Sequence, residues 1–260
     1  MIRPNFQNSV AIVTGASSGI GRATAIALAN HGARVALVAR RQALLEKVAG
    51  EIKALNNEAF VIPTDVKDRK QVELMVNTVL SHWGQIDILV SNAGDYIRAP
   101  IINLNVQDIQ RSMDINFYGG IYAILAVLPH MRERKSGYIV VVTSMDGKVG
   151  LPPDAPYVAA KFALTGFIDV LRQELYGSGI YVSNVLPGRV DTEMIEKLKV
   201  PWISAKISPD VVAASIVKAI HKRTPIVMIP TRAAMLFYVS VFAPSLSDML
   251  IRFFRLEGWE

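Results

Sequence analysis

Short apolar runs alternate with longer amphipathic stretches through most of this chain. The runs are rich in valine and isoleucine and lie at residues 10–14, 34–39, 59–62, 86–90, 138–143, 180–185 and 225–229. Such runs are typical of parallel strands that helices cover on both faces. Stretches between them, such as GRATAIALANHG at 21–32, have helical periodicity. The alternation predicts one doubly wound α/β domain of the Rossmann type, with about seven parallel strands.

Composition narrows the class of protein. Of the 260 residues, 51% are hydrophobic, which is enough for a large core. The chain has no cysteine, so disulfides, thiolate nucleophiles and cysteine metal sites are excluded, and its four histidines show no metal-ligand spacing. We therefore expect no metal. The net charge of +6 comes without a long basic run, which favours a nucleotide phosphate over a nucleic acid as the anionic partner. The first residues lack an apolar signal region, so a cytoplasmic location is expected.

A glycine-rich turn follows the first apolar run. Ligands of doubly wound sheets bind beyond the carboxyl ends of the strands, where the winding reverses. There the sequence GASSGIG places Gly15, Gly19 and Gly21 directly before a helix. Glycines let backbone N–H groups approach a phosphate at the helix N-terminus. A lone glycine turn is weak evidence, but this position favours nucleotide binding by the loop, in which we include Ser17, Ser18 and Ile20.

Two arginines follow the second apolar run. NAD-dependent sites usually carry an acid about 20 residues past the glycines to bind the ribose, but no acid precedes Glu46 here. Arg40 and Arg41 stand in its place, and guanidinium groups bind a 2′-phosphate well. We therefore predict NADP(H) rather than NAD(H), with Arg40 as the stronger candidate. The alternative is that both arginines only decorate a helix start.

A tyrosine and a lysine stand four residues apart in the stretch PYVAAK. On a helix this spacing places Tyr157 and Lys161 on the same face. The spacing is common by chance, so the pair alone does not indicate a catalytic site.

Several motifs together resemble the classical short-chain dehydrogenase/reductase (SDR) family over residues 8 to about 230. They occur in the family's order and are TGASSGIG (14–21), Asp65–Val66, NAG (92–94), Asn116, Ser144, YxxxK (157–161) and PG (187–188). Each motif is weak alone, but the set is specific.

The resemblance assigns catalytic roles to four residues. It implies that Tyr157 is the general acid and base, and that Lys161 lowers the pKa of the phenol and binds the nicotinamide ribose. Ser144 would bind the substrate oxygen, and Asn116 would hold a water that relays protons. The alternatives are a buried asparagine bonded to the backbone and a serine in a turn.

The resemblance also implies the cofactor contacts. Beside the glycine turn, the arginines, Tyr157 and Lys161, these are Asp65 and Val66 at the adenine, Asn92, Ala93 and Gly94 at the fourth strand end, and Pro187, Gly188, Val190 and Thr192 near the nicotinamide. For Asp65 the alternative is a cap of the next helix.

Two further segments bear on the substrate. Residues 191–208 are expected to form the substrate loop of the domain at 1–230, with Met194, Leu198 and Trp202 facing an apolar ligand. The segment before Pro152–Pro153 and residues 96–98 would form the remaining wall. Residues 231–260 are expected to form a helical extension with one apolar stripe at Leu246, Met249, Leu250, Phe253 and Phe254.

Three interpretations of this extension stay open. The first is packing in the core or between subunits, the second is a lid beside an apolar pocket, and the third is a helix on a membrane surface.

The sequence therefore predicts an NADP(H)-dependent oxidoreductase that interconverts a carbonyl and an alcohol, on a lipophilic small molecule. The alternatives are a redox sensor that binds NADP(H) without turnover and a nucleotide-sugar epimerase or dehydratase. We expect a homodimer or homotetramer.

Overall fold

The computed structural model describes residues 6–259, and residues 1–5 and 260, the ends of the predicted domain and extension, lie outside this range. One sheet of seven parallel strands runs through the molecule in the order β3-β2-β1-β4-β5-β6-β7. The strands are β1 (Val10–Thr14), β2 (Arg34–Ala39), β3 (Ala59–Pro63), β4 (Ile88–Ser91), β5 (Gly137–Val142), β6 (Ile180–Pro187) and β7 (Ile226–Ile229). The predicted fold class is confirmed.

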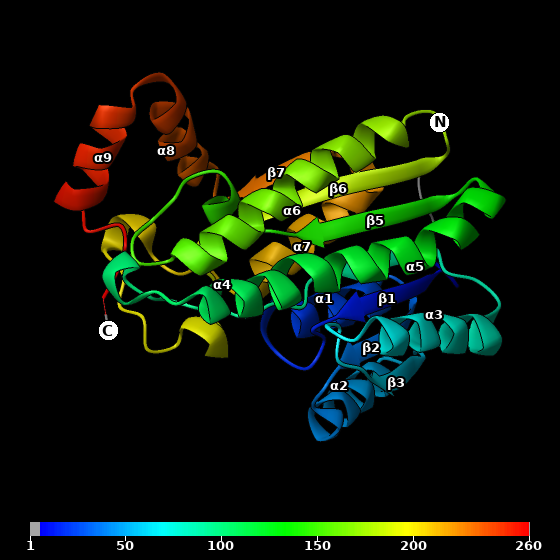
Figure 1. The fold of residues 1–260 in the computed structure, drawn as a ribbon. Coiled ribbons are helices and arrows are strands. Elements are labelled where there is room, and N and C mark those ends of the chain that lie inside the picture. Colours follow the sequence, from blue (N-terminus) through cyan, green and yellow to red (C-terminus); the bar gives the residue numbers. More distant parts are fainter. Residues whose placement is uncertain (1–5, 260) are drawn as a thin grey trace.

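Helices cover both faces of the sheet (Figure 1). They are α1 (Gly19–Asn30), α2 (Gln42–Ala54), α3 (Arg69–Trp83), α4 (Val106–Met113), α5 (Gly119–Arg134), α6 (Ala155–Glu174), α7 (Pro209–Lys222), α8 (Thr231–Phe242) and α9 (Pro244–Phe253). One buried cluster joins the sheet to α1, α2 and α7. A second joins its other face to α3, α5 and α6. The strands are apolar on both faces because each face is covered.

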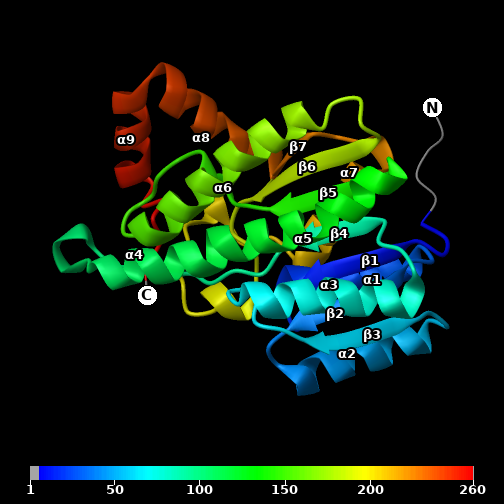
Figure 2. The same cartoon turned by 45° about the vertical axis from the view of Figure 1, so that its right-hand side comes forward.

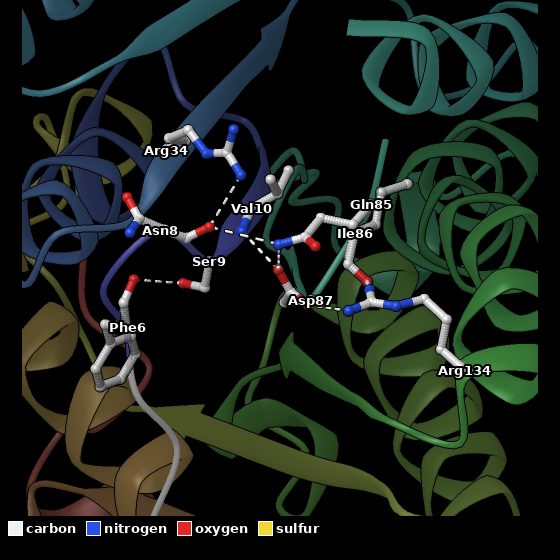
Figure 3. A network of polar contacts seen from close by, with 9 residues as sticks. All are labelled: Phe6, Asn8, Ser9, Val10, Arg34, Gln85, Ile86, Asp87 and Arg134. Carbon is white, nitrogen blue, oxygen red and sulfur yellow. Dashed lines mark hydrogen bonds and ion pairs between the residues drawn. The ribbon is translucent and has the colours of Figure 1, made fainter. Parts of the chain in front are cut away.

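A polar network fastens the amino ends of the strands, at the edge opposite the carboxyl ends (Figure 3). Asp87, just before β4, accepts hydrogen bonds from the Val10 N–H at 2.8 Å and from Gln85 Nε2 at 2.9 Å. Its other oxygen pairs with Arg134 at the end of α5, at 2.8 Å. The network therefore joins β1, β4 and α5 at the edge of the sheet opposite the carboxyl ends of the strands.

Helices α8 and α9 form a hairpin beyond the sheet (Figures 1 and 2). The two helices pack on each other, and α8 also contacts β7 and the turn after β5. Within residues 6–259, no helix has both the length and the apolar character needed to span a bilayer. The hairpin lies at the end of the molecule where the strands have their carboxyl ends.

Candidate active site

A cavity of about 620 Å³ lies at the carboxyl edge of the sheet. It begins at the glycine turn between β1 and α1, passes the ends of β4, β5 and β6, and reaches the α8–α9 hairpin. Every residue that the sequence assigned to catalysis or cofactor binding lines it, except Gly21. Segments far apart in the sequence thus meet in one space, as the strand-end rule predicts.

The glycine turn has a conformation that favours glycine. Gly15 and Gly19 have φ angles of +69° and +53°, a region that other residues rarely adopt. A Cβ on Gly15 would come within 2.8 Å of Asn92 Nδ2, and one on Gly21 would collide with the Gly15 carbonyl oxygen. Gly21 therefore lets α1 start close against the turn and does not itself face the cavity. No described side chain caps α1 at its N-cap residue Ser18, so its first N–H groups suit a phosphate.

The two arginines differ in their surroundings, although both line the cavity. Arg41 donates to Ser18 Oγ at 2.8 Å and to Ser17 Oγ at 3.2 Å. It also forms an ion pair of 3.0 Å with Glu193 of the substrate loop. Arg40 is exposed and has no ion pair or hydrogen bond from its side chain within residues 6–259. Its guanidinium is therefore free to bind an added phosphate.

Asp65 does not cap the helix that follows it. Asp68 does so instead, because its side chain accepts hydrogen bonds from the N–H groups of Lys70 and Gln71. Asp65 lines the cavity beside Val66 and receives the N–H of Lys67 at 3.0 Å. The helix cap is therefore Asp68, and the adenine contact of Asp65 stays a prediction.

Tyr157 and Lys161 lie on the first turns of α6 and face the end of β5. Lys161 Nζ donates to the Val142 carbonyl oxygen at 3.3 Å and lies 5.5 Å from the centre of the Tyr157 ring. Burial lowers the pKa of Lys161 to about 8, against the opposing effect of Asp146. The two side chains converge, as the spacing predicted.

The pKa of Tyr157 moves in the direction opposite to our expectation. Burial, and then the charge of Asp146, raise this pKa, and the hydrogen bond with Ser144 opposes the rise only in part. The reason is that the phenol is buried and the nearby carboxylate disfavours a phenolate. Tyr157 is therefore a neutral phenol at neutral pH, the form that donates a proton.

Asn116 occupies a π-helical turn at 114–118, between α4 and α5. Its Nδ2 donates to the Asp95 carbonyl oxygen at 2.9 Å and to Ser112 Oγ at 3.1 Å, and its Oδ1 accepts from the Asp95 N–H at 3.1 Å. This is the geometry of a buried asparagine bonded to the backbone. It fixes the segment after β4, and the proton-relay role stays a prediction.

Comparison with known proteins gives the family. The sequence model of the short chain dehydrogenase family matches residues 9–201. The chain belongs to the short-chain dehydrogenase/reductase family. An uncharacterized oxidoreductase of Listeria innocua is 38% identical over 195 residues, which cover 74% of this chain and 79% of that protein. The Drosophila melanogaster dehydrogenase/reductase SDR family protein 7-like is 34% identical over 99% of this chain and 84% of its own.

A solved structure agrees with the sequence relatives. It is the alcohol dehydrogenase of the archaeon Thermococcus sibiricus in complex with 5-hydroxy-NADP. The two chains share 28% identity with a TM-score of 0.78, over 86% of this chain and 96% of that one. This short-chain dehydrogenase/reductase is therefore similar to that solved structure over most of its length.

In the segment 191–208, two of the three residues predicted to face a ligand lie at the cavity. Met194 and Leu198 line the cavity. Trp202 does not, and it is 81% exposed. The reason is a 3₁₀ turn at Trp202–Ser204, in which Ile203 and Ser204 face the cavity instead. The prediction for Trp202 was wrong because side-chain type alone does not fix the direction of a residue in so short a turn.

The C-terminal hairpin divides its apolar residues between two surroundings. Leu236, Val239, Leu250 and Phe254 line the cavity together with three further hairpin or tail residues, Ala233, Met235 and Leu256. The rest of the predicted stripe is exposed: Leu246 at 44%, Met249 at 56% and Phe253 at 77%. The prediction of a single buried stripe was wrong because only part of α9 faces the cavity. The hairpin walls the pocket, which was the second of the three interpretations.

The sequence motifs did not indicate three charged residues that lie near the cavity. Asp146 and Arg189 line the cavity just after β5 and β6. Asp154 lies behind the wall with its side chain 0% exposed. The sequence could have indicated Asp146 and Arg189, because both stand within a few residues of a strand end, where ligands bind in such sheets. Nothing in the sequence pattern indicated that Asp154 is buried.

Asp154 holds the wall segment at 96–98 against the start of α6. It accepts a hydrogen bond of 2.5 Å from the Tyr96 hydroxyl and pairs with Arg98 at 2.8 Å. The Tyr96 ring in turn meets the Tyr157 ring edge-on, with centroids 5.0 Å apart. Burial raises the pKa of Asp154 despite these partners, so the carboxylate depends on Tyr96 and Arg98 to offset its burial, and loss of either partner should destabilise the wall.

Removing the Tyr96 hydroxyl tests this arrangement. We expect Tyr96→Phe to lower the free energy of unfolding by about 1.5–3 kcal/mol, because a buried carboxylate loses a hydrogen bond. Urea denaturation measures the difference. The matched control is Tyr176→Phe. Tyr176 is 92% exposed, so loss of its hydroxyl should leave the free energy of unfolding nearly unchanged. Equal stability of the two variants would contradict the assigned role of Asp154.

Proposed function

We propose that this protein is an NADP(H)-dependent oxidoreductase that interconverts a lipophilic carbonyl compound and its alcohol. One observation carries the proposal. A single cavity joins the glycine turn and Arg40 to Tyr157, Lys161 and Ser144, and then to an apolar chamber below the α8–α9 hairpin. A dinucleotide and an apolar substrate would share this space and meet at the phenol.

The residues at the first part of the cavity fit a dinucleotide phosphate. The turn has glycines at positive φ, and the N-terminus of α1 has no side-chain cap among the described residues. The guanidinium of Arg40 adds a cation at the end of β2, where a 2′-phosphate would lie. The nicotinamide, when bound, supplies or accepts the hydride.

The chain's own residues then bind the substrate oxygen and donate a proton to it. Tyr157 is a neutral phenol and donates its proton to the oxygen as negative charge develops there. Ser144 holds the same oxygen by a hydrogen bond. Lys161, fixed by the Val142 carbonyl, keeps a cation beside the phenol and makes loss of the proton less costly. This arrangement favours the reductive direction.

The apolar chamber leads to a prediction about chain length. Its walls are side chains such as Met194, Leu198, Leu236 and Phe254. Burial of one CH₂ group is worth about 0.8 kcal/mol. We therefore expect kcat/KM for straight-chain methyl ketones to rise roughly threefold to fourfold per added methylene until the chamber is full.

The rate of NADPH consumption across the ketone series measures this dependence. Val239→Asp, which places a charge in the chamber wall, should flatten it. A matched control is Val241→Asp on the exposed side of the same helix, where the residue is 56% exposed. A flat series in the wild-type protein would contradict the lipophilic substrate, and NADPH binding without any turnover would favour a redox sensor.

A further inference from the structure

One carboxylate in the cavity has no part in the chemistry described so far. Asp146 lies two residues after Ser144, in the 3₁₀ turn at Met145–Gly147 that follows β5. Its backbone N–H donates to Ser144 Oγ at 3.0 Å, and the Ser144 hydroxyl donates to Asp146 Oδ2 at 3.2 Å. The serine expected to bind the substrate oxygen therefore directs its hydrogen bond to a neighbouring carboxylate.

The second oxygen of Asp146 is available for a ligand. Oδ1 accepts no hydrogen bond from residues 6–259, and no described cation lies within ion-pair distance of the carboxylate. Lys161 and Arg189 act on it only from farther away, and burial raises its pKa to about 6. Asp146 faces the cavity and has an unused acceptor. A carboxylate in such a place needs a hydrogen-bond donor.

We propose that Asp146 selects carbonyl substrates that carry a hydroxyl group on the carbon next to the reacting carbonyl. The inference rests on the proposed function. Oxygens on neighbouring carbons lie within hydrogen-bonding separation of each other, as do the oxygens of Ser144 and Asp146. The substrate hydroxyl donates to Asp146 Oδ1, so the carboxylate keeps a hydrogen bond when the Ser144 hydroxyl turns from Oδ2 to the carbonyl oxygen. A simple ketone offers no donor, so the Ser144 hydroxyl keeps its hydrogen bond to Asp146.

The charges around Asp146 favour a neutral donor. A substrate carboxylate would be repelled by Asp146 and by buried Asp154, which also raises the pKa of Asp146. A substrate ammonium would meet Lys161 and Arg189, the two cations that act on the same site. A hydroxyl carries no charge, so neither the two carboxylates nor the two cations repel it. The class that fits is an α-hydroxy ketone or aldehyde with an apolar remainder.

The reaction of this class balances without a further reactant. In reduction, a hydride from the reduced nicotinamide forms a C–H bond at the carbonyl carbon while the C=O π bond breaks. The carbonyl oxygen takes the Tyr157 proton, and the neighbouring hydroxyl keeps all its bonds. The product is a vicinal diol, and the cofactor is oxidised by two electrons.

A matched pair of ketones tests the selection. The probes are methyl octyl ketone and hydroxymethyl octyl ketone, which differ by one hydroxyl. A hydrogen bond to a charged group corresponds to roughly a tenfold to hundredfold difference. We therefore expect wild-type kcat/KM to favour the hydroxy ketone by at least about tenfold. Asp146→Ala should bring the ratio close to one, and Asp146→Asn, which keeps the shape, should give an intermediate ratio.

A control variant separates this effect from a general change of charge. Glu196→Ala removes an exposed carboxylate from the substrate loop, outside the cavity lining, and should keep the wild-type ratio. An Asp146→Ala ratio equal to that of the wild type would overturn the proposal, even if both ketones are reduced and the proposed function stands.

Binding of the products gives a readout that needs no turnover. Calorimetry of the NADP⁺ complex with the diol and with the simple alcohol should show tighter binding of the diol in the wild type and equal binding in Asp146→Ala. If neither ketone is reduced, the proposed function fails for this class, while the calorimetric ratio still decides on Asp146. Equal binding of diol and alcohol by the wild type would refute the selection.

Discussion

Replacement of Tyr157 with phenylalanine is expected to lower kcat by about 10²- to 10⁴-fold. In the proposed function, the phenol is the proton donor at the point where the cavity passes from the glycine turn to the apolar chamber. Removal of its oxygen leaves the developing alkoxide without a proton source. The ring itself remains, so its edge-on contact with Tyr96 should survive, and the variant should fold normally.

The affinity for NADPH separates this effect from a damaged site. Fluorescence titration should give a Kd within about twofold of the wild-type value, because the glycine turn and Arg40 are untouched. Tyr176→Phe, at an exposed position, is the control and should turn over normally. Equal activity of Tyr157→Phe and the wild type would reject the assigned mechanism.

The raised pKa of Tyr157 changes how the pair with Lys161 is understood. The sequence suggested a cation that makes the phenol a base. In the structure, burial and Asp146 raise the pKa of the phenol, so the phenol stays protonated. The spacing of Tyr157 and Lys161 could be read from the sequence because a helix places them on one face. The balance of charges could not, since it depends on Asp146, which reaches the site from another strand end.

The sheet was predictable for a simple physical reason. Each strand is covered on both faces, so each appears as an apolar run, and all seven predicted runs match a strand to within two residues at each end. The same pattern placed the glycine turn, Ser144 and the proline–glycine pair at strand ends, and the family resemblance assigned the roles of Ser144 and of that pair. These positions follow from topology, which the alternation of runs and helices determines.

The substrate side was less predictable because its elements lack such a rule. Trp202 points outward owing to a single 3₁₀ turn, and α9 divides its apolar residues between cavity and solvent. In both cases the direction of a side chain depends on which neighbour the element packs against. The buried Asp154 is the clearest example, since its partners Tyr96 and Arg98 lie more than fifty residues away in the chain.

Cofactor choice gives the second large effect, at Arg40. The sequence favoured Arg40 over Arg41, and the contacts supply a reason for the same order. Arg41 already binds Ser17, Ser18 and Glu193, so its charge is partly compensated. Arg40 faces the cavity with no partner among the described residues. Arg40 should therefore bind a 2′-phosphate more strongly than Arg41 does.

We expect Arg40→Asp to raise the Kd for NADPH by at least about a hundredfold, because a charge-assisted contact is lost and a repulsion is added. The Kd for NADH should fall or stay the same, since an acid at this place can bind the ribose hydroxyls. Arg41→Ala should weaken NADPH binding less than Arg40→Ala does. Titration of both cofactors against each variant measures these changes.

The control is Lys53→Asp, which makes the same change of charge on the exposed surface of α2, outside the cavity lining. It should leave both dissociation constants nearly unchanged, because charges exposed to solvent and far apart are screened. An Arg40→Asp variant that weakened NADPH and NADH equally would show that the arginine does not distinguish the 2′-phosphate. Preference for NADP(H) would then have to arise at Arg41 and the two serines, and Arg41→Ala, combined with a reversal of the Glu193 charge, would be the variant to show it.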